Sequence, residues 1–130
     1  MKKIIFVCVG NSGRSQMAEA IFNKMTEGEA LAASAGTMPA GLVDPDVIEL
    51  MKEEGIDISS AKPKQLTTEM LKEADKVITM GCGVEEACPA FRVNSEDWGL
   101  PDPKGKSKEE IRKIRDEIKV RVIRLLQETL

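Results

Sequence analysis

The chain has 130 residues, of which 42% are apolar and 32% are charged, and its net charge is −3. This size and balance predict one soluble globular domain over residues 1–130, and they exclude a disordered chain or one that spans a membrane. The slightly acidic balance argues against nucleic acid as a partner. The chain contains no histidine, which excludes any site that needs an imidazole as a base or as a metal ligand.

The first half of the chain alternates between strand and helix patterns. Residues 3–9 form an apolar run typical of a buried strand, and residues 14–27 follow with a helical spacing of apolar side chains. Residues 31–36 are rich in alanine, but their place after a helix favours a second parallel strand. Asp44 and Pro45 predict the start of a second long helix, which we expect to end near Gly55.

The second half continues this alternation. Thr67 predicts the cap of a short helix through Leu71, residues 76–80 predict a third strand, and residues 91–93 predict a fourth. Ser107 and Glu110 form a capping box that opens the last helix. Its apolar stripe predicts core packing and consists of Ile111, Ile114, Ile118, Val122 and Leu125. The whole predicts an α/β fold, an open parallel four-stranded sheet with helices on both faces, which binds ligands at the carboxyl ends of its strands.

The segment between the first strand and the first helix carries the strongest chemical signal. It reads Cys-Val-Gly-Asn-Ser-Gly-Arg-Ser, from Cys8 to Ser15. Its backbone N–H groups and the helix dipole favour an anion, and the planar fork of Arg14 suits two oxygens of a tetrahedral oxyanion. The same groups and the Ser15 hydroxyl stabilise a thiolate, so Cys8 is predicted to be a nucleophile. The alternative is a buried structural cysteine. The candidate binding residues are Val9, Gly10, Asn11, Ser12, Gly13, Arg14 and Ser15.

Two further cysteines lie far along the chain. Three cysteines cannot all pair within one chain, and the first apolar run stops too early for a signal peptide, so we expect a cytoplasmic protein with reduced thiols. On a regular helix the Cα atoms of Cys82 and Cys88 would be ~9 Å apart. A disulfide needs ~7 Å or less, so this pair could join only if the segment bends or unwinds. Two unrelated core thiols, or a soft metal held by all three cysteines, are the other interpretations.

The Cys8-x5-Arg14-Ser15 pattern resembles the phosphate-binding loop of low-molecular-weight protein tyrosine phosphatases. Residues 8–19 closely resemble the same region of their relatives, the thioredoxin-coupled arsenate reductases. Residues 34–37, the pair of Cys82 and Cys88, and residues 98–103 match in the same order, so the resemblance spans essentially the whole chain. It implies a phosphatase-like fold with a flavodoxin-type strand order.

The resemblance also implies a reaction. Arsenate, with phosphate or sulfate as mimics, would bind at Arg14 and be attacked by Cys8, while Asp102 resembles the general acid of the family. Cys82 would then form a disulfide with Cys8, and Cys88 would move it to a Cys82–Cys88 disulfide. Thioredoxin or a similar dithiol protein would reduce that bond. The resemblance implies a monomer that needs no metal, flavin or nicotinamide.

Two other functions share the same loop. The first is a phosphatase for tyrosine or other phosphomonoesters that uses Cys8, Arg14 and Asp102. The chain has no tyrosine for an aromatic rim, and Lys104 and Gly105 follow Pro103 where aromatic residues would be expected, which argues against phosphotyrosine. The second is a protein that binds an oxyanion or arsenite without turnover.

Three features limit what the resemblance transfers. Residues 101–105 have strong turn chemistry, so the sequence alone favours a turn role for Asp102. Trp98 is best interpreted as a residue that packs in the core. Many of the resembling reductases have a cysteine at the position of Gly13. Some bind a potassium ion through residues matching Asn11, Glu19 and Ser34 with an aspartate, whose place falls near Lys64 here. Its ammonium could substitute for the ion.

Overall fold

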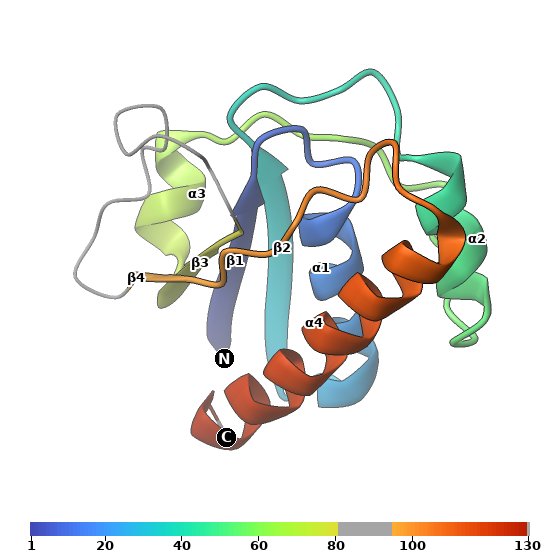
Figure 1. Ribbon diagram of the computed structural model, residues 1–130. Coiled ribbons are helices and arrows are strands. Elements are labelled where there is room, and N and C mark those ends of the chain that lie inside the picture. The colour runs from blue at the N-terminus through green and yellow to red at the C-terminus, as the bar shows by residue number, and fades with distance from the viewer. Residues whose placement is uncertain (81–94, 130) are drawn as a thin grey trace.

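The structure is a computed structural model that describes residues 1–80 and 95–129. Its elements follow the predicted alternation (Figure 1). In chain order they are β1 (Lys2–Cys8), α1 (Arg14–Thr26), β2 (Ala30–Gly36), α2 (Pro45–Lys52), α3 (Thr68–Glu73), β3 (Lys76–Thr79), β4 (Ser95–Asp97) and α4 (Lys108–Thr129). Within the described ranges, none of the helices combines the length and the apolar character needed to cross a membrane.

The four strands form one parallel sheet in the order β2-β1-β3-β4, which confirms the predicted strand order. Cys8, the last residue of β1, pairs with Gly36, the last residue of β2. The strand predicted at residues 91–93 lies outside the described residues. The fourth strand that the structure describes is β4, whose three exposed side chains are Ser, Glu and Asp and carry no strand signal.

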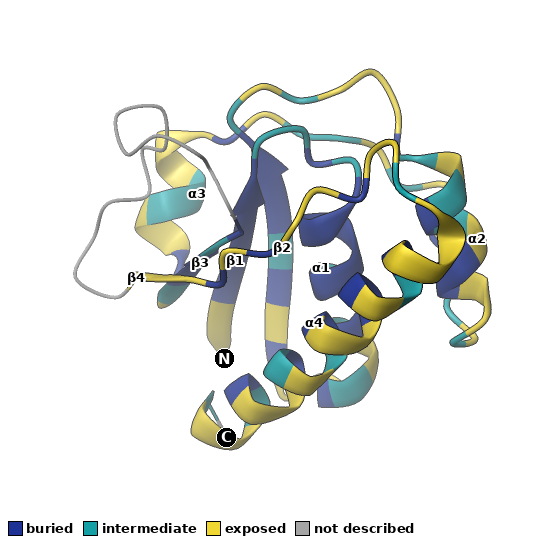
Figure 2. Cartoon of the chain, in the orientation of Figure 1, coloured by how far each residue is buried: buried dark blue, intermediate teal, exposed yellow. Residues whose placement is uncertain are grey.

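The two faces of this sheet are covered unequally. Ile4, Phe6 and Cys8 of β1 point to one face, which α1, α2 and α4 cover, and we call it the thick face (Figure 1). Ile5 and Val7 point to the opposite or thin face, which α3 covers. The thick face holds the larger core, and Figure 2 shows that α1 is buried over most of its length. Trp98 packs into this core against Phe6, with 5.6 Å between ring centroids, as predicted for it.

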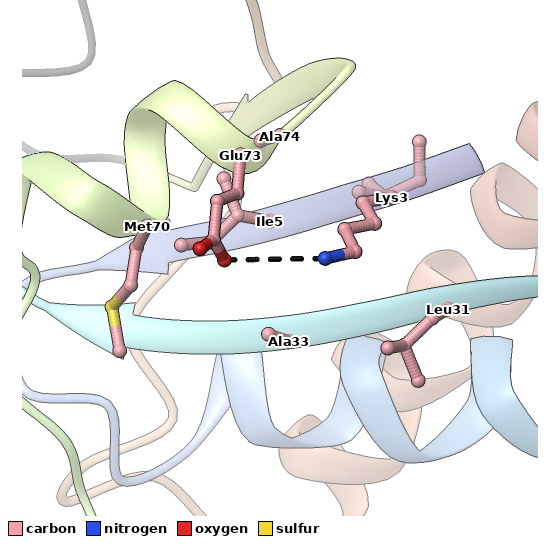
Figure 3. A pocket seen from close by; sticks show the side chains of 8 residues that line it. Lys3, Ile5, Leu31, Ala33, Met70, Glu73 and Ala74 are labelled. Atoms are coloured by element: carbon pink, nitrogen blue, oxygen red, sulfur yellow. Dashed lines mark ion pairs between the residues drawn. The ribbon is translucent and has the colours of Figure 1, made fainter. Parts of the chain in front are cut away.

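The thin face is open at its outer edge. Figure 3 shows the groove there, where the side chain of Met70 of α3 extends to β2 at one side of Ala33 and the Lys3 ammonium reaches across to Glu73. The ion pair is 4.0 Å long, and Leu31 at the end of the groove is 47% exposed. No residue of α3 itself is fully buried. This helix therefore contributes little apolar burial, in contrast to α1.

The predicted helix starts are confirmed by their caps. The Asp44 side chain accepts the N–H of Asp46 at 2.9 Å, and Pro45 is the first residue of α2. Ser107 accepts the N–H of Glu110 at 3.2 Å, which is the N-cap half of the predicted capping box, and its hydroxyl donates to the Glu110 carboxylate at 3.1 Å. Thr67 caps α3 by accepting the N–H of Met70 at 3.2 Å.

Candidate active site

Cys8 lies at the carboxyl end of β1, where the sheet meets the start of α1. Its side chain is 2% exposed, and its sulfur lies 2.8 Å from the hydroxyl of Ser15 and accepts the N–H of Asn11 at 3.2 Å. The structure thus brings Cys8 and Ser15 together as the sequence predicted. A sulfur among hydrogen-bond donors at a helix N-terminus is stabilised as a thiolate.

The outer wall of the loop is a ladder of backbone hydrogen bonds. The N–H groups of Thr37, Met38 and Ala40 donate to the carbonyls of Cys8, Val9 and Gly10 at 3.1, 2.9 and 2.9 Å. Asp44 donates to the carbonyl of Ser12 at 2.9 Å. In a trans peptide unit the N–H points opposite to the carbonyl, so fixing these carbonyls outward turns the following N–H groups inward. The loop therefore turns amide donors towards its inner side, an arrangement that binds oxyanions.

Arg14 is buried beside the loop, with 6% of its surface exposed. One guanidinium nitrogen donates to the carbonyl of Leu100 at 2.8 Å, and another lies 3.9 Å from the carboxylate of Asp102. The segment from Leu100 to Asp102 thus holds the guanidinium of Arg14 in place. An arginine has five N–H donors, so an anchored Arg14 can still donate to an oxyanion.

Asp102 has the predicted turn conformation, and its role as a general acid stays a prediction. One carboxylate oxygen accepts the N–H of Lys104 at 3.0 Å, as in a turn, and the other faces Arg14. Its side chain is 62% exposed, so water reaches it. The adjacent Pro103 lies against the loop so closely that a Cβ on Gly13 would come within 2.6 Å of its ring. This contact fixes the distance between the turn and the loop.

A hollow opens beside the loop at this point. It is bounded on one side by the loop of residues 37–44 and on the other by the turn that carries Asp102 and Pro103. Its lining residues are Ser12, Ala40, Gly41, Leu42, Asp44, Asp102, Pro103 and Lys104. Of residues 8–15, Ser12 lines the hollow, which therefore adjoins the loop on the side of Asp102.

Some predicted site residues lie elsewhere. Cys82 and Cys88 fall outside the described residues, so their distance to Cys8 stays a prediction. Sequence reasoning assigned no role to Gln16 or to Lys62. Behind the loop, the side chain of Gln16 and the backbone N–H of Lys64 both donate to the side-chain oxygen of Asn11. Gln16 reads in the sequence as an ordinary polar helix residue, and its partner Lys62 is 46 positions away.

The residues matching a potassium site do not fit that ion. The Lys64 ammonium lies 3.7 Å from the Glu19 carboxylate, so it supplies the positive charge that a potassium ion would bring to this position. The side-chain oxygen of Asn11 already accepts two N–H groups, from Gln16 and from the Lys64 backbone. Ser34 contributes a buried hydroxyl that has no hydrogen-bond partner in the described part of the chain. Within those residues there is also no cluster of three cysteine or acidic side chains suited to a metal.

Comparisons with known proteins match this chain over most of its length. The family model for low molecular weight phosphotyrosine protein phosphatase matches residues 3–130. The arsenate reductase of Staphylococcus xylosus is 41% identical, with 93% of each chain covered. A solved structure of an arsenate reductase in the phosphate-binding state is 38% identical, with a TM-score of 0.89 and 98% of each chain covered.

Two further solved structures come from proteins with different activities, one a reductase and one a phosphatase. A thioredoxin-dependent arsenate reductase from Corynebacterium glutamicum is 36% identical with a TM-score of 0.82, covering 98% of this chain and 61% of that one. An arginine phosphatase from Geobacillus stearothermophilus is 28% identical with a TM-score of 0.87, covering 99% and 93%. The fold is therefore shared by both chemistries, and sequence identity is higher to the reductases.

Proposed function

Because the chain belongs to the low molecular weight phosphotyrosine protein phosphatase family and is similar over most of its length to arsenate reductases, we propose that it reduces arsenate. The observation that carries the proposal is the surrounding of the Cys8 sulfur. It accepts the N–H of Asn11 and lies 2.8 Å from the hydroxyl of Ser15, in the loop that also carries the buried Arg14. A nucleophile and an oxyanion site thus coincide.

In the first step the Cys8 thiolate attacks arsenic(V) in a bound arsenate. A sulfur–arsenic bond forms while an arsenic–oxygen bond breaks, and Asp102 protonates the departing hydroxide to water. Arg14 and the loop amides hold the remaining oxygens. The 62% exposed Asp102 carboxyl can take up a new proton from solvent after each turnover.

In the second step the Cys82 thiolate attacks the sulfur of Cys8. The electron pair of the sulfur–arsenic bond moves to arsenic, which leaves as arsenite, and a Cys8–Cys82 disulfide forms. Cys88 then attacks Cys82, which frees Cys8 and gives a Cys82–Cys88 disulfide. Two electrons from a dithiol protein of the thioredoxin class restore both thiols. The thioredoxin dependence of the Corynebacterium relative supports this reductant, which also fits a cytoplasmic role in arsenic resistance.

The second candidate is hydrolysis of a phosphomonoester by Cys8, Arg14 and Asp102. The likeness to an arginine phosphatase supports it, because the loop chemistry of the two reactions is shared. Hydrolysis gives no role to Cys82 and Cys88, whereas reduction requires both.

One set of assays separates these functions. Wild type, Cys82→Ser and Cys88→Ser are each assayed for arsenate reduction with thioredoxin and for hydrolysis of an aryl phosphate. We expect both variants to lose arsenate turnover while any aryl phosphate hydrolysis survives. A wild type that hydrolyses the ester but does not reduce arsenate would establish the phosphatase. A wild type with neither activity that binds arsenate would be a binding protein.

A further inference from the structure

Gln16, on the first turn of α1, is buried behind the catalytic loop with 1% of its surface exposed. Its side-chain amide nitrogen lies within hydrogen-bond distance of three acceptors, all of them oxygens. These are the side-chain oxygen of Asn11 at 3.0 Å, the backbone carbonyl of Asn11 at 3.2 Å and the carbonyl of Lys62 at 3.2 Å. Gln16 therefore contacts both the backbone and the side chain of Asn11.

Asn11 is the residue on which the loop depends. It adopts a left-handed backbone conformation with φ of 51°, and its backbone N–H donates to the Cys8 sulfur. Its side-chain oxygen accepts N–H groups from Gln16 and, at 2.8 Å, from the backbone of Lys64. Two donors on one atom fix that atom as the oxygen, so the Asn11 amide nitrogen must face Ser15, to which it donates at 2.7 Å.

This orientation settles the direction of the last hydrogen bond. Because the Ser15 oxygen accepts a hydrogen from Asn11, its own hydrogen is free to point at the Cys8 sulfur 2.8 Å away. The donors then run in one direction, from Gln16 to Asn11, to Ser15 and to Cys8. A chain of donors that ends on a sulfur favours the thiolate over the thiol, and each bond polarises the next.

We propose that Gln16 is a positioning residue for the Cys8 thiolate, acting through the orientation of the Asn11 amide. Without the Gln16 donor, one of the two hydrogen bonds that hold the Asn11 oxygen is lost, and the amide can turn away from Ser15. The Ser15 hydroxyl then loses the neighbour that directs its hydrogen to sulfur. The inference rests on the proposed nucleophilic role of Cys8, but its test needs no arsenate.

The test is the absorbance of the thiolate near 240 nm as a function of pH. The chain has no tyrosine, so no phenolate absorbs in the same range. Replacing Cys82 and Cys88 by serine leaves Cys8 as the sole thiol. In this background we expect Gln16→Met, which keeps the length of the side chain but removes its donors, to move the midpoint to higher pH by about half a unit or more.

Gln65→Met is the matched control. Gln65 also donates its amide to backbone carbonyls near the loop, those of Gly36 and Thr37 at 3.4 and 3.3 Å, but it is exposed and has no contact with Asn11. Its replacement should leave the midpoint in place. In an Asn11→Ala background, Gln16→Met should add no further shift, because its route to the sulfur is already gone.

Three outcomes would overturn the proposal. The first is an unchanged midpoint in Gln16→Met, even if the protein is less stable, because Gln16 would then only pack. The second is an equal shift in Gln65→Met, and the third is a full shift in the Asn11→Ala background. If Gln16→Met does not fold, Gln16→Ala is titrated in its place and judged by the same shift.

Discussion

The two faces of the sheet differ in how completely they are covered, and the site is built on the better covered one. The thick face buries large side chains of α1, α2 and α4 around Phe6, whereas α3 on the thin face has no fully buried residue. The side chain of Cys8 belongs to the thick core, and α1, whose first turn carries Arg14 and Ser15, packs there as well. A nucleophile held within hydrogen-bond distance of its donors needs such a rigid support.

The largest difference should appear when one side chain is shortened on each face. Ile118 of α4 is fully buried in the thick core, so Ile118→Ala should lower the free energy of unfolding by about 2–5 kcal/mol. Met70→Ala on the half-buried α3 should cost about 1 kcal/mol or less. Urea unfolding of both variants measures the difference. Equal losses would show that the thin face contributes as much stability as the thick one.

Packing on the thick face should also affect the catalytic activity of the loop of residues 8–15. A Cβ on Gly13 would collide with the ring of Pro103. Gly13→Ala should displace the turn that carries Asp102 and lower kcat/KM for arsenate by about 10- to 100-fold. Gly41→Ala is the control, since open space surrounds that position. Full activity of Gly13→Ala would mean that the Pro103 contact does not position Asp102.

A smaller loss of stability is expected at the contact between α1 and the outer strand β2. The Asn23 side chain accepts the N–H of Ala32 at 2.8 Å and donates to its carbonyl at 3.0 Å, as a neighbouring strand would. Asn23→Ala should therefore cost about 1–2 kcal/mol in thermal or urea unfolding. Its exposed neighbour Lys24 donates to carbonyls after α2, and Lys24→Ala should change stability by no more than about 0.5 kcal/mol. An Asn23→Ala variant as stable as Lys24→Ala would contradict the role given to this amide.

The smallest effect concerns the outer surface of the thick face, where α2 and α4 are joined by ion pairs. Hydrogen bonds from Arg112 and then Arg115 lower the pKa of Glu53 from 4.5 to about 2. A lowered pKa means that the folded state binds the proton less tightly than the unfolded chain. The stabilisation is therefore full above pH 4.5 and is lost as the pH falls towards 2.

Unfolding of wild type and Glu53→Gln at a series of pH values measures this contribution. The difference between them should be largest near pH 6 and should shrink towards pH 2. A Glu53→Gln difference that is constant with pH would exclude the linkage.

The sequence predicted best those features of the structure that depend on residues close together in the chain. The first strand, the Asp44 cap with Pro45, and the Ser107 cap of α4 all depend on residues within a short stretch, and the structure has each of them. The loop was predictable for the same reason, because the donors around Cys8 lie within seven positions of it.

The features that the sequence did not predict depend on contacts between segments that are far apart in the chain. β4 is a strand because its backbone pairs with β3, although Ser, Glu and Asp have low strand propensity. Gln16 contacts Lys62, and Pro103 contacts Gly13, across separations that no local pattern reports. The uneven cover of the sheet likewise appears only when α3 and α1 are seen on opposite faces.

The central claim is that Cys8 passes its oxidised state to a second thiol as arsenite leaves. The most direct test is a single turnover of Cys88→Ser with arsenate and no thioredoxin, followed by mass spectrometry of the digested protein. We predict one arsenite released per protein chain and a disulfide between Cys8 and Cys82. Arsenite formed while Cys8 and Cys82 both stay free to react with an alkylating agent would contradict the account.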